Sequence, residues 1–298
     1  MDPSRMHPQA RTAMEVQQHA ALTVDNVAAM RRSMRDATPD EVGAGPPVHR
    51  VMDLDADGVP VRLYVAEAQA GVPVLVYAHG GGWVLGDLET HDGLCRHLAV
   101  ATGWAVLAVD YRRPPEFPCP AAADDLERAL AWVRRTAATH GLDRARIAVA
   151  GDSSGAHVAA VVARRARDAG RPVVAQVLIC PVIDPAMDYP DLDGYGLRRD
   201  EMRFFWDAYA PTGVDRQHPD VNPLRADLAG LPPAVVITAE LDVLRDDGER
   251  YASRLLAAGV PVTCVRYLGV NHNFVRKLAV FDAASVAVAQ IAAALRRY

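Results

Sequence analysis

The sequence predicts an α/β protein whose central sheet is mostly parallel and covered by helices on both faces. From residue 73 onward, short apolar runs rich in β-branched residues alternate with helical patterns. Strands that are apolar along their whole length are typical of parallel sheets buried on both faces. The chain has 298 residues, of which 50% are hydrophobic and 23% charged, which is the composition of an ordinary globular protein.

The first 45 residues predict amphipathic helices. Apolar residues recur there near helical spacing among polar ones, at Val16, Ala20, Leu22, Val27, Met30 and Met34. A Gly/Pro cluster at 43–47 then interrupts the pattern. Two short alternating segments follow, at 48–54 and 59–65, and the Asp57-Gly58 pair between them indicates a β-hairpin.

The alternating region supplies the remaining elements. We expect strands at 73–78, 105–109, 146–150, 173–179, 234–238 and 262–265. We expect helices at 121–139, 154–169, 246–258 and 282–297. The residues between 180 and 234, rich in Asp, Pro and aromatic residues, break the alternation. A structureless loop of that length is improbable in a compact domain, so we interpret it as an insertion carrying its own helices.

Charge and composition exclude several kinds of partner. The formal net charge of −5 and the pI near 6.0 exclude nucleic acid as the main partner. The chain has 31 arginines and a single lysine, Lys277, which we interpret as codon bias. No run of 18 apolar residues predicts a membrane span, and no secretory signal is visible at the N-terminus.

The cysteines favour a reducing compartment. Four of them are scattered without zinc-like spacing, at positions 95, 119, 180 and 264. We therefore expect free thiols, no metal site and a cytoplasmic location.

The strongest chemical signal is Gly151-Asp152-Ser153-Ser154-Gly155, which fits the G-x-S-x-G pattern of a nucleophile elbow. In such an elbow, glycines flank a strained turn that holds a serine hydroxyl above the sheet. The motif follows the predicted strand 146–150 and opens the predicted helix 154–169, which is the context that this mechanism requires. Ser153 is therefore the candidate nucleophile.

A glycine-rich loop, His79-Gly80-Gly81-Gly82-Trp83, directly follows the strand 73–78. Acyl transfer needs backbone N–H groups aimed at a developing oxyanion, and glycines let the backbone approach it closely. The competing interpretation, a phosphate-binding loop, lacks the G-K-[ST] signature.

Chain order selects the other catalytic candidates. In proteins with a nucleophile elbow, the catalytic serine is followed along the chain by a catalytic acid and then by a catalytic histidine. Of the three histidines after Ser153, His157 lies on the next helix, where a packed or surface role fits, and His218 lies in the insertion. His272 follows the strand 262–265 through a loop and can reach the sheet edge.

The acid is selected by its place after the strand 234–239. Asp242 follows that strand by a few residues and can orient the imidazole of the histidine. Its rivals are Glu240, Asp246 and Asp247. We interpret Asp246 as a helix cap.

With these motifs, the sequence resembles the hormone-sensitive-lipase-like esterases of the α/β-hydrolase fold, the bacterial family IV group. The resemblance runs from about residue 45 to the end of the sequence and rests on the glycine loop, the elbow, Asp110-Tyr111-Arg112, Cys180-Pro181-Val182-Ile183-Asp184, Asp242 and His272 with Phe274. It implies a mostly parallel eight-stranded sheet with helices on both faces and a helical cap. The cap would comprise 1–45 and 185–222, and the catalytic core 46–184 and 223–298.

The resemblance also implies an activity, which is hydrolysis of a small or medium acyl ester through an acyl-enzyme, without a cofactor. Ser153 would be the nucleophile, His272 the general base and then acid, and Asp242 its orienting partner. Backbone N–H groups of Gly81, Gly82 and Ser154 would form the oxyanion hole, and His79 would support the glycine loop. Candidate walls of the substrate pocket are five aromatic residues, Trp83, Phe204, Phe205, Trp206 and Tyr209, for which packing in the core of the cap is the alternative.

Departures from the family pattern leave other functions open. Ser154 and Ala156 stand where the family usually has Ala and Gly, and Val243 and Asn273 also depart from its pattern. An acyltransferase, cyclase or lactone-processing tailoring enzyme using the same triad is therefore one alternative. A non-catalytic ligand-binding member of the fold is another. The expected partner is a small-molecule ester, and a homodimer through the final strand or last helix is a further hypothesis.

Overall fold

The computed structural model describes residues 2–16 and 21–298. Residue 1 and residues 17–20 lie outside the described part, and with them Ala20 of the predicted N-terminal helical pattern. Before the sheet begins, two α-helices are described, α1 (Pro8–Val16) and α2 (Val27–Val42), with the short 3-10 helices η1 (Pro3–Arg5) and η2 (Val24–Asn26). The prediction of helices in this region is confirmed for the described residues.

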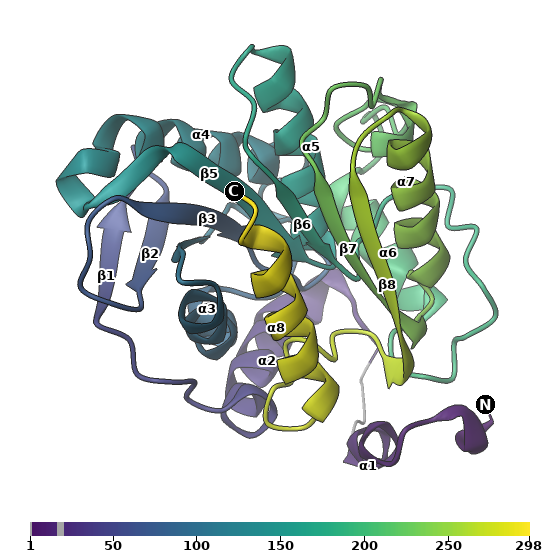
Figure 1. Ribbon diagram of the computed structural model, residues 1–298. Helices are drawn as coiled ribbons and strands as arrows, with labels where there is room; N and C mark the ends of the chain where they lie inside the picture. Colours follow the sequence, from purple (N-terminus) through teal and green to yellow (C-terminus); the bar gives the residue numbers. More distant parts are fainter. Residues whose placement is uncertain (1, 17–20) are drawn as a thin grey trace.

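A single eight-stranded sheet forms the centre of the molecule, with the strand order β1-β2-β4-β3-β5-β6-β7-β8 (Figure 1). The strands are β1 (Arg50–Asp55), β2 (Pro60–Val65), β3 (Val72–Ala78), β4 (Ala105–Val109), β5 (Leu142–Asp152), β6 (Gln176–Ile179), β7 (Ala234–Leu241) and β8 (Val262–Asn271). The β1–β2 hairpin and the β2–β4 pair are antiparallel, and all other pairs are parallel. The predicted fold class is confirmed.

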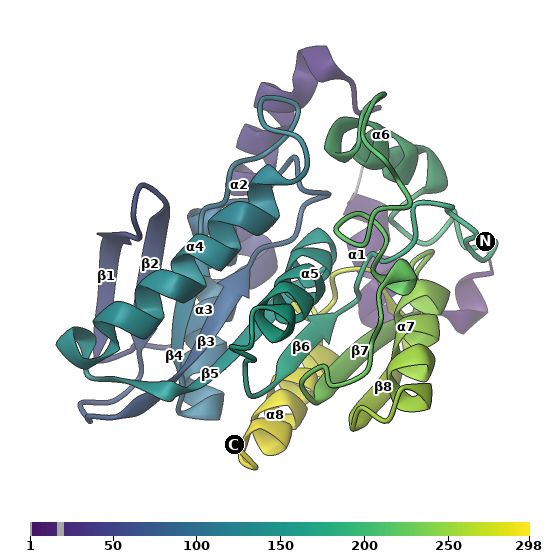
Figure 2. The ribbon, with the colours of Figure 1, turned by 90° about the horizontal axis from the view of Figure 1, so that it is seen from above.

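Helices cover both faces of this sheet, as the two ribbon views show (Figures 1 and 2). One face carries α3 (Leu88–Thr102) and α8 (Asp282–Leu295). The other face carries α4 (Ala121–Thr136), followed by η3 (Ala137–His140), together with α5 (Ser154–Asp168) and α7 (Arg245–Ala257). Residues of β3 and β4 are buried throughout, as expected for strands with helices on both sides. Within the described ranges, no helix is both long enough and apolar enough to span a membrane.

The structure differs from the sequence predictions in one helix and in the limits of several strands. The helix α3 was not predicted, although Asp87 caps it with a capping box to Thr90 and Gly103 ends it in the left-handed conformation. The strand β8 continues to Asn271, so the predicted loop before His272 is part of the strand. The insertion after β6 carries its own helices as predicted, the α-helix α6 (Arg199–Tyr209) and the short helix η4 (Pro223–Arg225).

Candidate active site

The turn after β5 holds Ser153 in a conformation that few residues adopt. Its φ of 53° and ψ of −120° place it in a strained region, between the end of β5 and the first residue of α5. Glycine is required on both sides, because a Cβ at Gly155 would overlap the carbonyl oxygen of Ala78 and one at Gly151 would overlap the backbone of Gly155. The sequence therefore folds into a tight elbow that presents the Ser153 hydroxyl at the carboxyl end of the sheet.

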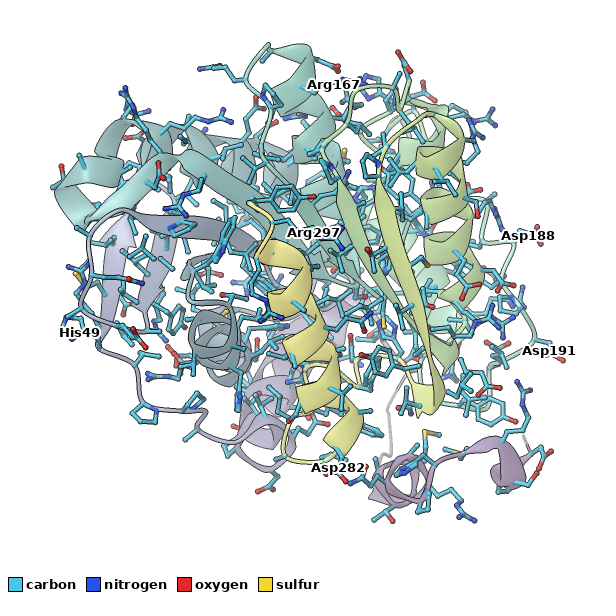
Figure 3. The ribbon with its side chains drawn as sticks, viewed as in Figure 1. His49, Arg167, Asp188, Asp191, Asp282 and Arg297 are labelled. Carbon is cyan, nitrogen blue, oxygen red and sulfur yellow. The ribbon has the colours of Figure 1, made fainter. Side chains whose placement is uncertain are left out.

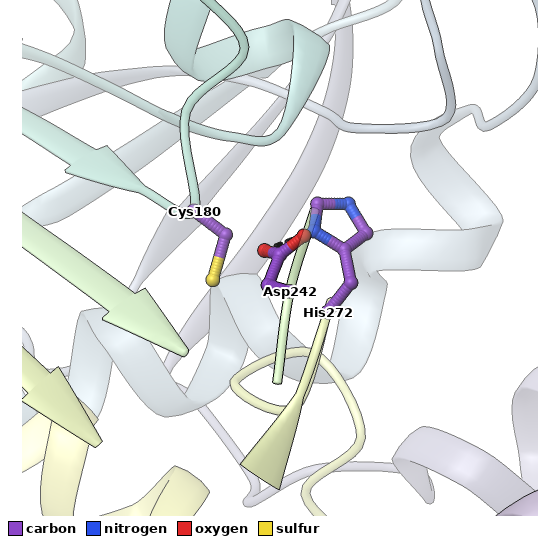
Figure 4. Close-up of side chains that lie close together, drawn as sticks. All are labelled: Cys180, Asp242 and His272. Carbon is purple, nitrogen blue, oxygen red and sulfur yellow. Dashed lines mark hydrogen bonds and ion pairs between the residues drawn. The ribbon is translucent and has the colours of Figure 1, made fainter. Parts of the chain in front are cut away.

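Three side chains from separate strand ends form a continuous hydrogen-bonded chain. The Oγ of Ser153 lies 3.0 Å from the Nε2 of His272, and the Nδ1 of His272 lies 2.7 Å from Oδ2 of Asp242. All three residues are buried, and Figure 4 shows the Asp242 carboxylate facing the imidazole of His272. The other carboxylate oxygen of Asp242 accepts a hydrogen bond of 2.9 Å from the backbone N–H of Leu244, which fixes its orientation.

The glycine loop after β3 lies against this elbow. Gly81 and Gly82 have positive φ values of 118° and 61°, so the loop follows a path that side chains would disfavour. A Cβ at Gly82 would also overlap the ring of Phe205 from α6. Both glycines line the same cavity as Ser153 and His272, so their backbone lies at the same site as these two side chains.

His79 is buried behind the glycine loop rather than at its surface. Its ring stacks on Tyr111 with centroids 4.2 Å apart, and the hydroxyl of Tyr111 donates a hydrogen bond of 2.7 Å to the backbone carbonyl of His79. Burial, with the positive charge of Arg113 contributing, lowers the pKa of His79 to about 3. The ring of His79 is therefore held neutral by its burial and lies stacked on Tyr111 behind the loop.

Asp152, the residue before the nucleophile, ties the elbow to the glycine loop. Its Oδ1 accepts hydrogen bonds from the hydroxyl of Tyr77 at 2.6 Å and from the N–H of Gly80 at 2.9 Å. Burial alone would raise the pKa of Asp152, but the nearby ring of His91 and the hydroxyl of Tyr77 lower it below its ordinary value. An ionised Asp152 therefore holds the two loops together, a role that the motif alone did not reveal.

A cavity of about 200 Å³ opens above Ser153 and His272. Its apolar wall comes from α2 and the residues before it, from the residues just after the glycine loop and from the segment that contains α6. The residues are Leu22, Met30, Met34, Ala37, Leu85, Leu197, Met202 and Phe205. Among the five aromatic residues predicted to line a pocket, Phe205 lies on this cavity, and Phe204 packs 5.8 Å from it between ring centroids.

The other three aromatic residues, Trp83, Trp206 and Tyr209, form a buried cluster. The ring of Trp83 stacks on Tyr209 with centroids 4.3 Å apart and lies 4.7 Å from Trp206. Their packing partner is His157, which is fully buried and has its Nε2 3.0 Å from the carbonyl oxygen of Val221. His157 thus has the packed role of the two expected for it.

The rival acids and the last remaining histidine lie apart from the serine. His218 is exposed, and Glu240 accepts a hydrogen bond from the N–H of Gly269. Asp246 does not cap α7, which was the wrong interpretation, because the helix begins at Arg245 and the Asp246 carboxylate pairs with the Arg245 side chain. Asp247 is buried, and its carboxylate accepts hydrogen bonds from the backbone N–H groups of Ile183 and Asp184 in the loop after β6.

Four charged residues on the cavity wall were not predicted, Glu201 and three that form one ion-paired group. Glu41 on α2 pairs with Arg276 and Lys277, which follow His272 in the chain. The one signal in the sequence was the uniqueness of Lys277, which composition alone explained as codon bias. The contact joins residues 235 positions apart, so no local pattern could reveal it.

One group of possible metal ligands was found among the described residues, and it overlaps the hydrogen-bonded chain. Cys180, Asp242 and His272 have ligand atoms within 4.8 Å of one another (Figure 4). Burial, with the Asp242 carboxylate adding to the effect, raises the pKa of the Cys180 thiol well above its ordinary value. A protonated thiol is a poor metal ligand, so Cys180 is better explained as packing behind Asp242.

Comparison with known proteins agrees with this geometry. Residues 75–276 match a family model described as the alpha/beta hydrolase fold. The esterase LipI of Mycobacterium tuberculosis is 42% identical over 287 residues, covering 91% of this chain and 88% of the relative, and the carboxylesterase NlhH of the same organism is 44% identical over 250 residues, covering 80% and 78%. A solved esterase of Pyrobaculum calidifontis superposes with a TM-score of 0.91 at 39% identity, covering 98% of each chain.

Proposed function

We propose that this chain, which belongs to the α/β-hydrolase family and within it to the hormone-sensitive-lipase-like esterases, acts through a Ser153–His272–Asp242 triad. Like its relatives, it is a carboxylic ester hydrolase. The observation that carries the proposal is the hydrogen-bonded chain from Ser153 Oγ through His272 to Asp242. A serine hydroxyl is a weak nucleophile unless a neighbouring base takes its proton, and the proposal is supported by the 3.0 Å between Ser153 Oγ and His272 Nε2.

The reaction follows from these contacts in two halves. His272 Nε2 takes the proton of the Ser153 hydroxyl as Oγ attacks the carbonyl carbon of the ester. The ester C–O bond then breaks, His272 gives that proton to the leaving alcohol, and the acyl group remains on Ser153. His272 then takes a proton from a water molecule as the water oxygen attacks the acyl carbon. The bond between that carbon and Ser153 Oγ breaks, His272 gives the proton to Oγ, and the carboxylic acid is released. Asp242 holds the imidazole in the required tautomer and stabilises its charged form.

The negative charge of the tetrahedral intermediate needs donors that are in place beforehand. We assign this role to the backbone N–H groups of Gly81, Gly82 and Ser154. Ser154 is the first residue of α5, where the N–H groups and the helix dipole favour negative charge. The Asp152 contacts to Gly80 and Tyr77 keep the glycine loop in position relative to the elbow.

The substrate is a small or medium acyl ester under this proposal. The cavity of about 200 Å³ is lined largely by apolar side chains, which suit an acyl chain of limited length. We assign residues 1–45 and 185–222 to a cap, because α2 and α6 supply walls of a cavity whose floor carries Ser153. The cap is therefore the part that selects the ester.

The nucleophile is tested by Ser153→Ala. The variant should lose turnover of p-nitrophenyl acetate and labelling by a fluorophosphonate probe, with an unchanged circular dichroism spectrum. Ser154→Ala is the matched control, since it removes the neighbouring hydroxyl and keeps the backbone N–H. Undiminished turnover in Ser153→Ala would refute the triad assignment. A series of p-nitrophenyl esters of increasing chain length tests the acyl size.

Two further properties belong to the proposal. The four cysteines are all free, which fits a cytoplasmic location. The strand β8 lies at the sheet edge, so its free backbone groups can pair with those of a second copy in a homodimer. Light scattering after size-exclusion chromatography tests the dimer, and a monomer at micromolar concentration would contradict it.

A further inference from the structure

The cavity has one charged end, which the proposed reaction does not use. Glu41, Arg276 and Lys277 all line it, together with Ser153 and His272. The Nζ of Lys277 lies 2.7 Å from Oε1 of Glu41, and the guanidinium of Arg276 pairs with Oε2. Both cations are buried, with Arg276 exposed by 4% and Lys277 by 8%. Charged side chains are seldom buried to this degree unless they are paired, and here one carboxylate, that of Glu41, pairs with two cations.

Lys277 carries more N–H donors than the acceptors found for it, whereas Arg276 donates both to Glu41 and, at 3.4 Å, to the carbonyl oxygen of Thr90. An ammonium carries three N–H donors, whereas Glu41 is the ion-pair partner found for Lys277 within residues 2–16 and 21–298. The Nε of Arg276 is buried and has no hydrogen-bond partner in the same part of the chain. The two carboxylate oxygens of Glu41 are both engaged already. Buried donors are normally satisfied, so this end of the cavity favours a ligand that brings acceptors.

The remaining charged residue of the cavity wall does not alter this balance. Glu201 lies in the first turn of α6, and its Oε2 accepts a hydrogen bond of 2.9 Å from the backbone N–H of Arg198. The positive end of the helix also compensates its charge. Apolar residues from α2 and α6 make up much of the remaining wall, so an ester can place its chain there while a polar end reaches Lys277.

We infer that Lys277 and Arg276 form a subsite for a carboxylate carried by the ester substrate. The inference rests on the proposed function, because it places the carboxylate relative to an ester bound at Ser153. Substrates of this class have a carboxylate several bonds from the scissile carbonyl, on either the acyl or the alcohol side. An anion at the subsite offers acceptors to the remaining N–H donors of the Lys277 ammonium, beside the positive charge of Arg276, and a charge-assisted hydrogen bond to a buried cation is stronger than a neutral one.

A purely structural role for the three charged residues makes a different prediction. Glu41 on α2 and the two cations after His272 could simply fasten the cap helix to the core. Loss of such a tether would change the turnover of every ester alike. A carboxylate subsite instead changes the ratio between anionic and neutral esters, and this ratio is the quantity to measure.

The experiment compares kcat/KM for monoethyl adipate with that for diethyl adipate, which differ in one free carboxylate. We expect the wild-type protein to prefer the monoester, and Lys277→Met to lower the ratio of the two constants by about tenfold or more. Lys277→Arg should keep most of the preference, because it retains a cation. Glu41→Gln should raise the ratio, because it removes the carboxylate that competes for both cations.

The control is Arg297→Met, which removes one positive charge from an exposed residue just beyond the end of α8, labelled in Figure 3. Arg297 lies beside the first residues of β7 and β8, at the amino ends of these strands, whereas the cavity lies at their carboxyl ends. The ratio should stay at the wild-type value in this variant. Acetyl esters of ω-hydroxy acids, compared with their methyl esters, show whether the carboxylate lies on the alcohol side instead.

Each outcome separates the subsite from the proposed triad. A ratio that is unchanged in Lys277→Met, or a wild-type protein that prefers the neutral ester in both substrate series, overturns the subsite while leaving the triad intact. Turnover of diethyl adipate that persists in Ser153→Ala overturns the triad itself. If Lys277→Met does not fold, the wild-type preference and the rise expected for Glu41→Gln still decide the question.

Discussion

Replacing Asp247 with asparagine should make the protein more stable at alkaline pH but not at acid pH. Asp247 lies in the first turn of α7, with 1% of its surface exposed. Its Oδ2 accepts hydrogen bonds from the N–H groups of Ile183 at 3.1 Å and Asp184 at 3.0 Å, while Oδ1 is buried without a partner in the described part of the chain. Asparagine can accept the same two bonds without carrying a charge.

The magnitude follows from the cost of ionising a buried carboxyl group. Burial raises the pKa of Asp247 from 3.8 to about 7. Between these values the folded state binds the proton more tightly than the unfolded state, so the free energy of unfolding falls as pH rises. The full difference corresponds to about 4 kcal/mol, reached above the folded-state pKa. The Asp247→Asn variant avoids this loss, so its gain in stability should approach zero near pH 4 and reach up to about 4 kcal/mol at pH 8.5.

The assay is urea unfolding followed by circular dichroism at pH 4.5 and pH 8.5. Asp246→Asn is the matched control, since it removes a carboxylate from the next residue, where 42% of the side chain is exposed. We expect a higher unfolding midpoint for Asp247→Asn at pH 8.5 alone. An equal gain at both pH values, or a loss of stability at pH 8.5, would show that the buried charge is not the cause.

Three other predictions concern the site and its supports. Asp242→Asn should lower kcat for p-nitrophenyl acetate by about 10³-fold or more, because the imidazole loses its anionic partner; a change in KM alone would contradict this. Gly155→Ala should fail to fold or melt far below the wild type, because the added Cβ overlaps the carbonyl oxygen of Ala78; a wild-type melting temperature would disprove the overlap. Trp206→Ala should cost about 3–5 kcal/mol in urea unfolding, since it leaves a cavity in the aromatic cluster; a loss below about 1 kcal/mol would mean that the cluster collapses around it.

Local patterns were sufficient for much of the fold. The apolar runs predicted the sheet because strands buried on both faces need no alternation, and β4 begins and ends at the predicted residues. The helix α3 was missed because His91, Gly93 and His97 interrupt its apolar face. Its capping residues, Asp87 and Gly103, were the available signal.

Part of the candidate site could likewise be predicted from local patterns, and part of it could not. Ser153, Asp242 and His272 could be selected by chain order, because each follows a strand whose carboxyl end faces one edge of the sheet. The residues of the cavity wall could not be selected in this way, because they depend on how α2 packs against the segment after His272. An aromatic residue such as Trp83 is compatible with a pocket or with a core, and the neighbours that decide between them are distant in sequence.

The position of His272 has a consequence for how the protein fails on heating. His272 directly follows β8, and β8 is paired with β7 on one side only, because it forms the sheet edge. Edge strands separate from a sheet at a lower free-energy cost than central ones. Fraying of a single strand would therefore withdraw the base from Ser153 while the rest of the sheet stays folded. We therefore expect activity to be lost on heating before the sheet unfolds as a whole.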